Sequence, residues 1–197
     1  MKKAILYTAL LFTFLTGAAQ SDNWYQVGFK ISASFPTNRF YSVDNDYLCS
    51  LTAADFGAFF RAGRYVYGEI GLGYAFYKGD YTVKLDDGSF AFDPVRVELR
   101  HLQIPVKAVG NVRLTRSVSL LPFAGIIWQP LLKVTGNTIG YNKNTLKNNS
   151  LLFTTGFDFK IGPIVLGVNY RYSLTKFFQN KEGKHPQYMN ACVGFQF

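Results

Sequence analysis

The chain is made of segments in which apolar and polar residues alternate one by one. In Trp24–Phe35, every second residue from Tyr25 onward is apolar, and the residues between them are mostly small or polar. The same period of two recurs in six further segments, 54–61, 65–77, 95–109, 153–160, 166–174 and 189–197, and 120–133 is a further apolar segment of strand length. Because successive side chains of a β-strand point to opposite faces, this period predicts strands with one apolar face. The pattern therefore predicts an all-β chain of eight strands.

Two of these segments have a less regular pattern. In 95–109 the apolar positions change phase between Leu99 and Leu102, which predicts a β-bulge at Arg100–His101. In 120–133 both faces are apolar, so the sequence does not show which residues of this strand share a face.

The connections between the predicted strands alternate in length. Those at 62–64, 110–116 and 161–163 are short, whereas those at 36–48, 78–94, 134–150 and 177–187 are long and polar. Up-and-down barrels of outer membranes alternate in this way, with short periplasmic turns and long outer loops, and their tilted strands need about 9–11 residues to cross. The sequence therefore predicts an eight-stranded antiparallel up-and-down transmembrane β-barrel.

The composition of the two faces distinguishes this barrel from a secreted lipocalin-like binding barrel, which remains an alternative. The polar face consists mostly of Gly, Ser, Asn, Thr and Gln, and the other face of Phe, Tyr, Val, Ile and Leu. A soluble barrel would turn a charge-rich face to water, whereas lipid requires an apolar exterior and leaves no backbone edge unpaired. We therefore expect the last strand to pair with the first.

The N-terminus has the composition of a secretory signal peptide. Lys2 and Lys3 precede twelve uncharged residues, Ala4–Leu15, and small residues follow up to Ala19. Twelve residues are too few for a membrane-spanning helix, which needs about 20. We expect residues 1–19 to be the signal peptide, cleavage near Gln20, and residues 20–197 to form the barrel in the cell outer membrane.

The chain is basic, with 21 Lys and Arg against 12 Asp and Glu and a net charge of +9. The basic residues are scattered, which does not favour a nucleic-acid partner and suits an anionic surface. Outer-membrane lipids and the phosphates of lipopolysaccharide are therefore the expected partners of its surface.

The charged residues on the polar faces of the predicted strands include Glu69, Lys107, Asp158 and Arg171. In a filled and poorly hydrated interior, an unpaired charge is costly. We predict that Glu69 contacts Lys107, because the two belong to neighbouring strands, and that Arg171 and Asp158 complete one interior network.

The sequence shows little catalytic chemistry. Some small outer-membrane barrels are lipid A-modifying enzymes, and this function is kept as an alternative. However, His101 and His185 both lack a serine at the strand spacing that would set a hydroxyl beside the imidazole. We assign no catalytic residue, no cofactor and no metal site.

Two stretches resemble a known family. The sequence HLQIPVKAVG at 101–110, and GFDFKIGPIVLGVNYRYSLTKFF at 156–178, resemble strands of the PorT-like, porin-family outer-membrane β-barrel proteins. This chain departs from the family pattern at Gln103, where Glu is usual, and at Lys107, which stands two residues before the usual lysine.

The resemblance implies an eight-stranded outer-membrane barrel that the barrel-assembly machinery inserts. It also implies that Phe195 and Phe197, on the alternating last strand, serve as an assembly signal to which that machinery pairs by β-augmentation. The family is defined by its fold, so the resemblance does not assign a task.

The interior of an eight-stranded barrel is just wide enough for side chains, so we do not expect an open diffusion pore. We expect a structural or interaction role in the cell envelope, as a possible subunit of an envelope complex. Contact with other envelope proteins would run through the outer loops 36–48, 78–94, 134–150 and 177–187.

Overall fold

The computed structural model describes residues 24–38, 40–41, 47–84, 90–135, 146–177 and 184–197; the expected signal peptide lies outside them. The strands are β1 (Tyr25–Pro36), β2 (Phe40–Tyr41), β3 (Tyr47–Gly63), β4 (Val66–Lys84), β5 (Phe90–Gly110), β6 (Val112–Arg113), β7 (Val118–Thr135), β8 (Asn149–Ile161), β9 (Ile164–Ser173) and β10 (Gln187–Gln196). The described part contains no helix long and apolar enough to span a membrane.

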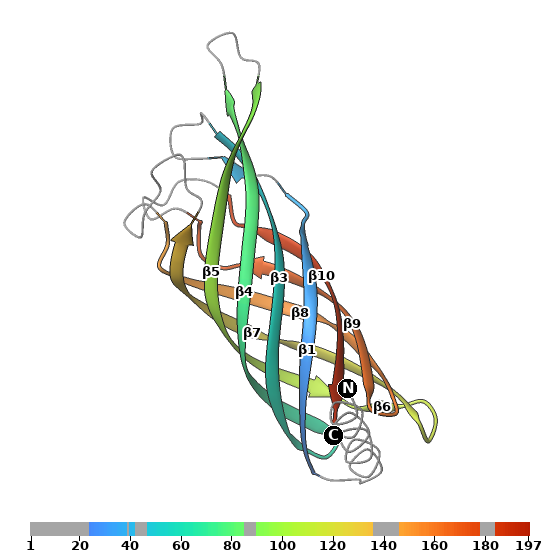
Figure 1. Cartoon of the computed structure of the whole chain (residues 1–197). Coiled ribbons are helices and arrows are strands. Elements are labelled where there is room, and N and C mark those ends of the chain that lie inside the picture. Colours follow the sequence, from blue (N-terminus) through green and yellow to red (C-terminus); the bar gives the residue numbers. More distant parts are fainter. Residues whose placement is uncertain (1–23, 39, 42–46, 85–89, 136–145, 178–183) are drawn as a thin grey trace, which may run out of the picture.

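The long strands close into a barrel (Figure 1). Two of the ten strands, β2 and β6, are only two residues long and pair at the ends of β3 and β7. The other eight run antiparallel in the order β1-β10-β9-β8-β7-β5-β4-β3, and β1 pairs with both β10 and β3. Closure pairs the backbone of every wall strand on both sides. The predicted fold class, and the pairing of the first strand with the last, are confirmed.

Apolar side chains cover the outside of the wall, and polar side chains fill much of the inside. In β1, Val27, Phe29 and Ile31 are exposed, whereas Ser32 and Ser34 are buried, and β8, β9 and β10 repeat this alternation. The predicted facing of these strands is confirmed. It is the reverse of the arrangement that a lipocalin-like soluble barrel would need, because such a barrel turns its polar face to water.

The predicted irregularity at Arg100–His101 is present, but the change of phase in the segment 95–109 is wrong. Arg100 pairs with Lys133 and His101 with Leu131, so the extra residue lies in β7. Strand β5 itself keeps an unbroken register with β4 across this point. Val97 and Leu99 therefore face inward and are buried. These two residues are apolar because they pack in an apolar part of the interior near the loop end. The inward and outward faces of β5 therefore do not exchange.

The structure also settles the facing of β7, which has apolar residues on both sides. Leu121, Phe123, Ile127 and Gln129 are buried inside, whereas Trp128 is exposed on the outside. The two faces look alike in sequence because the inner face of β7 contributes to apolar packing at both ends of the barrel.

The connections differ in one respect from those expected. Most of the predicted loop 78–94 is strand, because β4 continues to Lys84 and β5 begins at Phe90, and the two form a hairpin that projects beyond the rim (Figure 1). At the opposite end, Gly63 (φ 144°) and Gly162 (φ 58°) form tight turns with positive φ angles that favour glycine. We call these two ends the loop end and the turn end.

Two apolar clusters lie inside the barrel, one near each end. The loop-end cluster consists of Leu51, Ala53, Ala75, Tyr77, Val97, Leu99, Leu131, Leu146 and Tyr188. The turn-end cluster consists of Tyr67, Val109, Leu121 and Phe123. Polar and charged side chains occupy the interior between them.

Candidate functional site: the polar interior

Five charged residues from five strands meet inside the barrel, in the half nearer the turn end. Lys30 lies on β1, Arg61 on β3, Glu69 on β4, Lys107 on β5 and Asp158 on β8, each at an inward position of its strand. Arg61 is fully buried at the centre, where its Nε lies 2.6 Å from Glu69 Oε2 and its Nη2 lies 3.0 Å from Asp158 Oδ2. We call this group the five-ion cluster.

Each carboxylate of the five-ion cluster also holds one lysine. Lys107 Nζ lies 2.7 Å from Glu69 Oε1, and Lys30 Nζ lies 2.5 Å from Asp158 Oδ2. Arg61 donates a further hydrogen bond through Nη1 to Gln196 Oε1, at 2.7 Å, which ties β3 to β10. Three cations thus share two carboxylates, and all are hydrogen-bonded in ion pairs, as a buried charge requires.

A second group, the Asp55–Arg171 cluster, lies closer to the loop end. Arg171 Nη1 donates to Asp55 Oδ2 at 2.9 Å, and the Ser32 hydroxyl donates to the same carboxylate. Two amides complete the cluster: Asn169 donates to Asn190 Oδ1 at 2.9 Å, and Asn190 donates to Ser34 Oγ at 2.7 Å. This cluster joins β1, β3, β9 and β10 across the interior.

The residues expected in one network are therefore divided between two. Glu69 and Lys107 are in contact, and Asp158 joins them through Arg61. The expectation for Arg171 is wrong, because it pairs with Asp55 in the other cluster. Sequence reasoning missed Lys30, Asp55 and Arg61, although all three stand at inward positions of alternating strands, which was the available signal.

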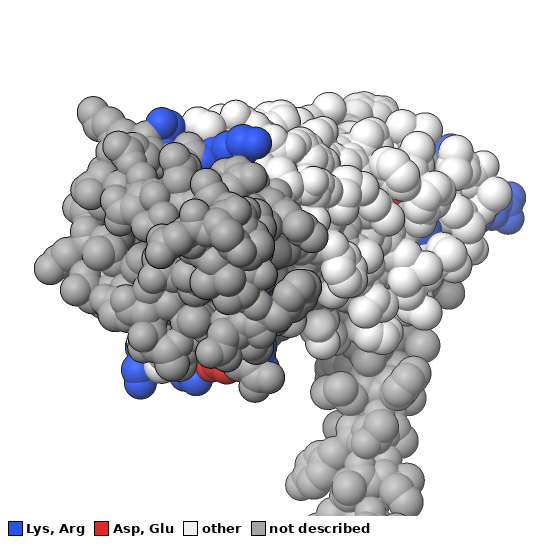
Figure 2. Space-filling model, turned by 90° about the horizontal axis from the view of Figure 1, so that it is seen from above, with Lys and Arg blue, Asp and Glu red and all other residues white. Residues whose placement is uncertain are grey.

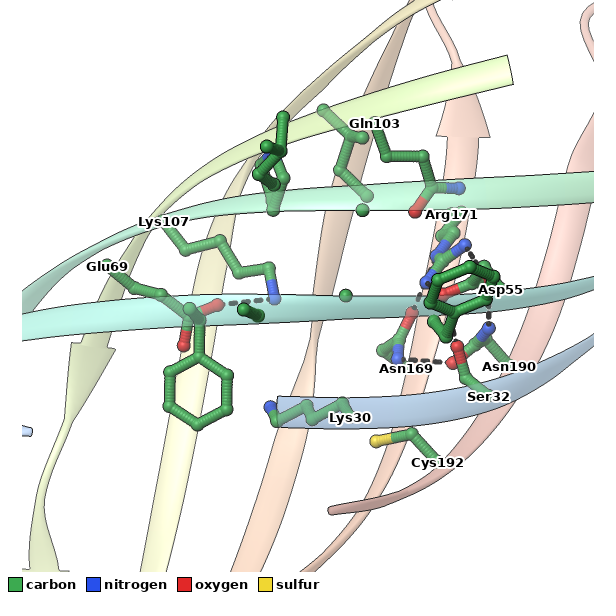
Figure 3. Close-up of a pocket in the computed structure, with 18 of the residues that line it drawn as sticks. Lys30, Ser32, Asp55, Glu69, Gln103, Lys107, Asn169, Arg171, Asn190 and Cys192 are labelled. Carbon is green, nitrogen blue, oxygen red and sulfur yellow. Dashed lines mark hydrogen bonds and ion pairs between the residues drawn. The ribbon is translucent and has the colours of Figure 1, made fainter. Parts of the chain in front are cut away.

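A cavity of about 60 Å³ lies between the two clusters (Figure 3). Figure 3 shows the ammonium groups of Lys30 and Lys107 on one side of it and the Asp55–Arg171 pair on the other. Gln103 also lines the cavity, as do Phe59, Phe123, Asn169, Asn190 and Cys192. The inward positions Gly57 and Gly73 face each other across β3 and β4 at its wall, and their missing side chains leave this space open.

Neither histidine lines this cavity. His101 is buried beside Tyr77, with ring centroids 5.2 Å apart, and its Nδ1 has no hydrogen-bond partner. His185 stacks on Tyr172, and its Nδ1 lies 2.8 Å from the backbone oxygen of Ser173. Within the described ranges, no three His, Cys, Asp or Glu side chains are grouped as a metal site would require.

The residues of the expected assembly signal lie on the outside of the β1–β10 pair. The ring of Phe195 is 5.3 Å from that of Phe29, and the ring of Phe197 is 6.4 Å from it. The backbone of Phe197 also exchanges two hydrogen bonds with Val27. The structure thus places both rings where the barrel closes, and the assembly role remains a prediction.

The fully exposed basic side chains that the structure describes lie near the two ends of the barrel. Where grey atoms do not cover it, the wall in Figure 2 is almost entirely white, with Lys and Arg near its ends. Exposed basic residues are Arg64, Arg113 and Arg116 at the turn end and Lys78, Lys133, Lys147 and Lys184 at the loop end. Asp55, Glu69 and Asp158 are buried, and Glu98 is partly buried.

Comparison with known proteins gives only distant similarity. No family model matches the chain, and no curated protein matches it. Among solved structures, it is similar to the translocator domain of the autotransporter NalP from Neisseria meningitidis, with 11% identity and a TM-score of 0.43, covering 100% of this chain and 97% of that one. It is also similar to the β domain of the Bordetella autotransporter BrkA, with 11% identity and a TM-score of 0.34, covering 88% of this chain and 99% of that one.

Proposed function

We propose that the chain is an integral outer-membrane β-barrel protein with a sealed interior, which serves a structural or interaction role in the cell envelope. The observation that carries this proposal is the apolar exterior. Large apolar side chains are exposed on all the wall strands, among them Ile31 on β1, Leu72 on β4 and Val193 on β10. Soluble monomers rarely expose apolar patches of more than a few hundred Å², whereas lipid contact requires such a surface.

The ends of the barrel support a membrane location. Trp24 and Tyr65 are exposed at the turn end, where aromatic rings are favoured at a membrane–water interface. The basic residues gathered at both ends suit anionic lipid headgroups, including the phosphates of lipopolysaccharide. In the proposed setting, these groups mark the two borders of the apolar band.

The filled interior favours a binding role over transport. Apolar side chains of the loop-end and turn-end clusters fill the interior near the two ends of the barrel. Between the two clusters, ion pairs connect opposite walls. A barrel without an open channel can act through its outer wall and its outer loops. We propose that the connections 36–48, 134–150 and 177–187 and the projecting β4–β5 hairpin contact other envelope proteins. We also propose that the barrel-assembly machinery inserts the chain and that the protein is not an enzyme.

The proposal is tested by fractionation and by conductance. The protein should be recovered with the outer membrane and should migrate faster on gels before heating than after it, because a closed barrel resists detergent. The folded protein in planar lipid bilayers should give no steady ion current, and the heat-unfolded sample is the matched control. Recovery in the soluble periplasmic fraction would contradict the membrane location. A stable current carried by the folded protein would contradict the sealed interior.

A further inference from the structure

The buried ion pairs contain one more positive charge than negative charge. In the five-ion cluster, Arg61 is shared by both carboxylates, and each carboxylate holds one lysine in addition. The Asp55–Arg171 pair is neutral by itself. The two clusters together therefore carry a charge of +1. An uncompensated charge in a poorly hydrated interior is costly, so a counter-charge is expected nearby.

The excess charge faces the cavity. Lys30 and Lys107 both line it, and their side chains are only 14% and 12% exposed. Their ammonium groups converge on one ring, because Lys30 Nζ lies 5.7 Å and Lys107 Nζ 4.8 Å from the centroid of Phe123. An ammonium group has three N–H donors. Each of these lysines therefore keeps donors after its bond to a carboxylate.

An unused donor lines the same cavity. Gln103 is buried, with 5% of its surface exposed, and its Nε2 has no hydrogen-bond partner. A buried amide N–H without a partner carries a desolvation cost of about 1–3 kcal/mol, so such groups are rare in folded proteins. An acceptor in the cavity would satisfy this amide.

We propose that the cavity binds one small monovalent anion, such as chloride, held by Lys30 and Lys107, with the amide of Gln103 as a further donor on the Arg171 side of the cavity. A single negative charge neutralises the two clusters, whereas a sulfate or phosphate dianion would reverse the sign. One water requires roughly 10–15 Å³ of such space, and the cavity of about 60 Å³ has room for a halide and accompanying water. This site does not depend on the proposed membrane location.

The site is tested by the dependence of stability on halide at constant ionic strength. The purified protein in zwitterionic detergent is unfolded in urea while sodium gluconate, which is too bulky for the cavity, is replaced stepwise by sodium chloride or bromide. We expect the urea midpoint to rise with halide concentration and to saturate, because a ligand that binds only the folded state stabilises it. The ³⁵Cl NMR line width should show the same saturable binding. An equal midpoint in chloride and gluconate would overturn the site.

Three variants assign the effect to the cavity. Lys107→Met leaves two cations and two carboxylates in the five-ion cluster, so the halide-dependent rise should disappear. Lys133→Met removes an exposed lysine from the end of β7 and should keep the full rise. Gln103→Leu keeps every charge and removes the donor, so half-saturation should need more chloride, and the ³⁵Cl measurement reports this even if Lys107→Met does not fold. An undiminished rise in Lys107→Met, or unchanged chloride affinity in Gln103→Leu, would overturn the assignment.

Discussion

Replacing Glu69 by glutamine should lower the free energy of unfolding by about 3–5 kcal/mol, the usual cost of breaking a buried ion pair by removing one partner. Glu69 is 2% exposed and holds both Arg61 and Lys107. Its loss leaves three cations of the five-ion cluster around Asp158 alone. The measurement is urea unfolding of the detergent-folded protein, monitored by tryptophan fluorescence and by gel mobility.

A second change should recover part of this loss. The double variant Glu69→Gln with Lys107→Met restores the excess of one positive charge, so it should be more stable than Glu69→Gln alone. A double-mutant cycle isolates this coupling, because the two side chains are in contact. Glu98→Gln is the matched control, since Glu98 is only partly buried and takes part in no ion pair of the described cluster. If Glu69→Gln were no less stable than Glu98→Gln, the interior network would not stabilise the barrel.

Replacing Ile31 by arginine should destabilise the barrel in lipid by about 2–4 kcal/mol, the cost of Arg at the bilayer midplane on the lipid face of a barrel. Ile31 is 57% exposed and lies midway along β1, opposite Val193 of β10 and Phe56 of β3. The measurement is urea unfolding of the protein folded into phospholipid vesicles.

The matched control lies at the turn end. Leu114 is about as exposed as Ile31, but it stands in the turn between β6 and β7. An arginine there should cost about 0–1 kcal/mol, because the penalty falls toward the interface. Equal effects of Ile31→Arg and Leu114→Arg would show that the wall does not face lipid. A stabilising effect of Ile31→Arg would show that this face is in water.

The contact between Glu69 and Lys107 could be anticipated from the sequence, whereas the partner of Arg171 could not. Glu69 and Lys107 stand directly opposite each other on the adjacent strands β4 and β5, so alternation and strand order are sufficient to bring them together. Arg171 and Asp55 lie on β9 and β3, which are not neighbours in the sheet. Their contact crosses the interior. Strand order alone does not show which side chains of two opposite walls lie at the same height along the barrel axis.

The level along the barrel axis also decided the facing of apolar residues on β5. Alternation assigns side chains to two faces, and it identifies the inner face only where that face is polar. Val97 and Leu99 belong to the apolar loop-end cluster. These inward positions are therefore apolar, as the outward positions of the wall are, and the sequence alone does not distinguish the two faces here. The irregularity was predicted at the right place, but only the pairing of β5 with β7 showed that the extra residue belongs to β7.

By itself, the sequence determined the closed eight-stranded barrel and the facing of most wall strands, because the outer face is mostly apolar and the inner face of those strands is mostly polar. The tertiary structure alone decided which charges pair and where the cavity lies. Arg61 and Asp158 are 97 residues apart in sequence, yet their side chains meet inside the barrel. The tilt and register of eight strands bring them to the same level, and these are properties of the closed sheet as a whole.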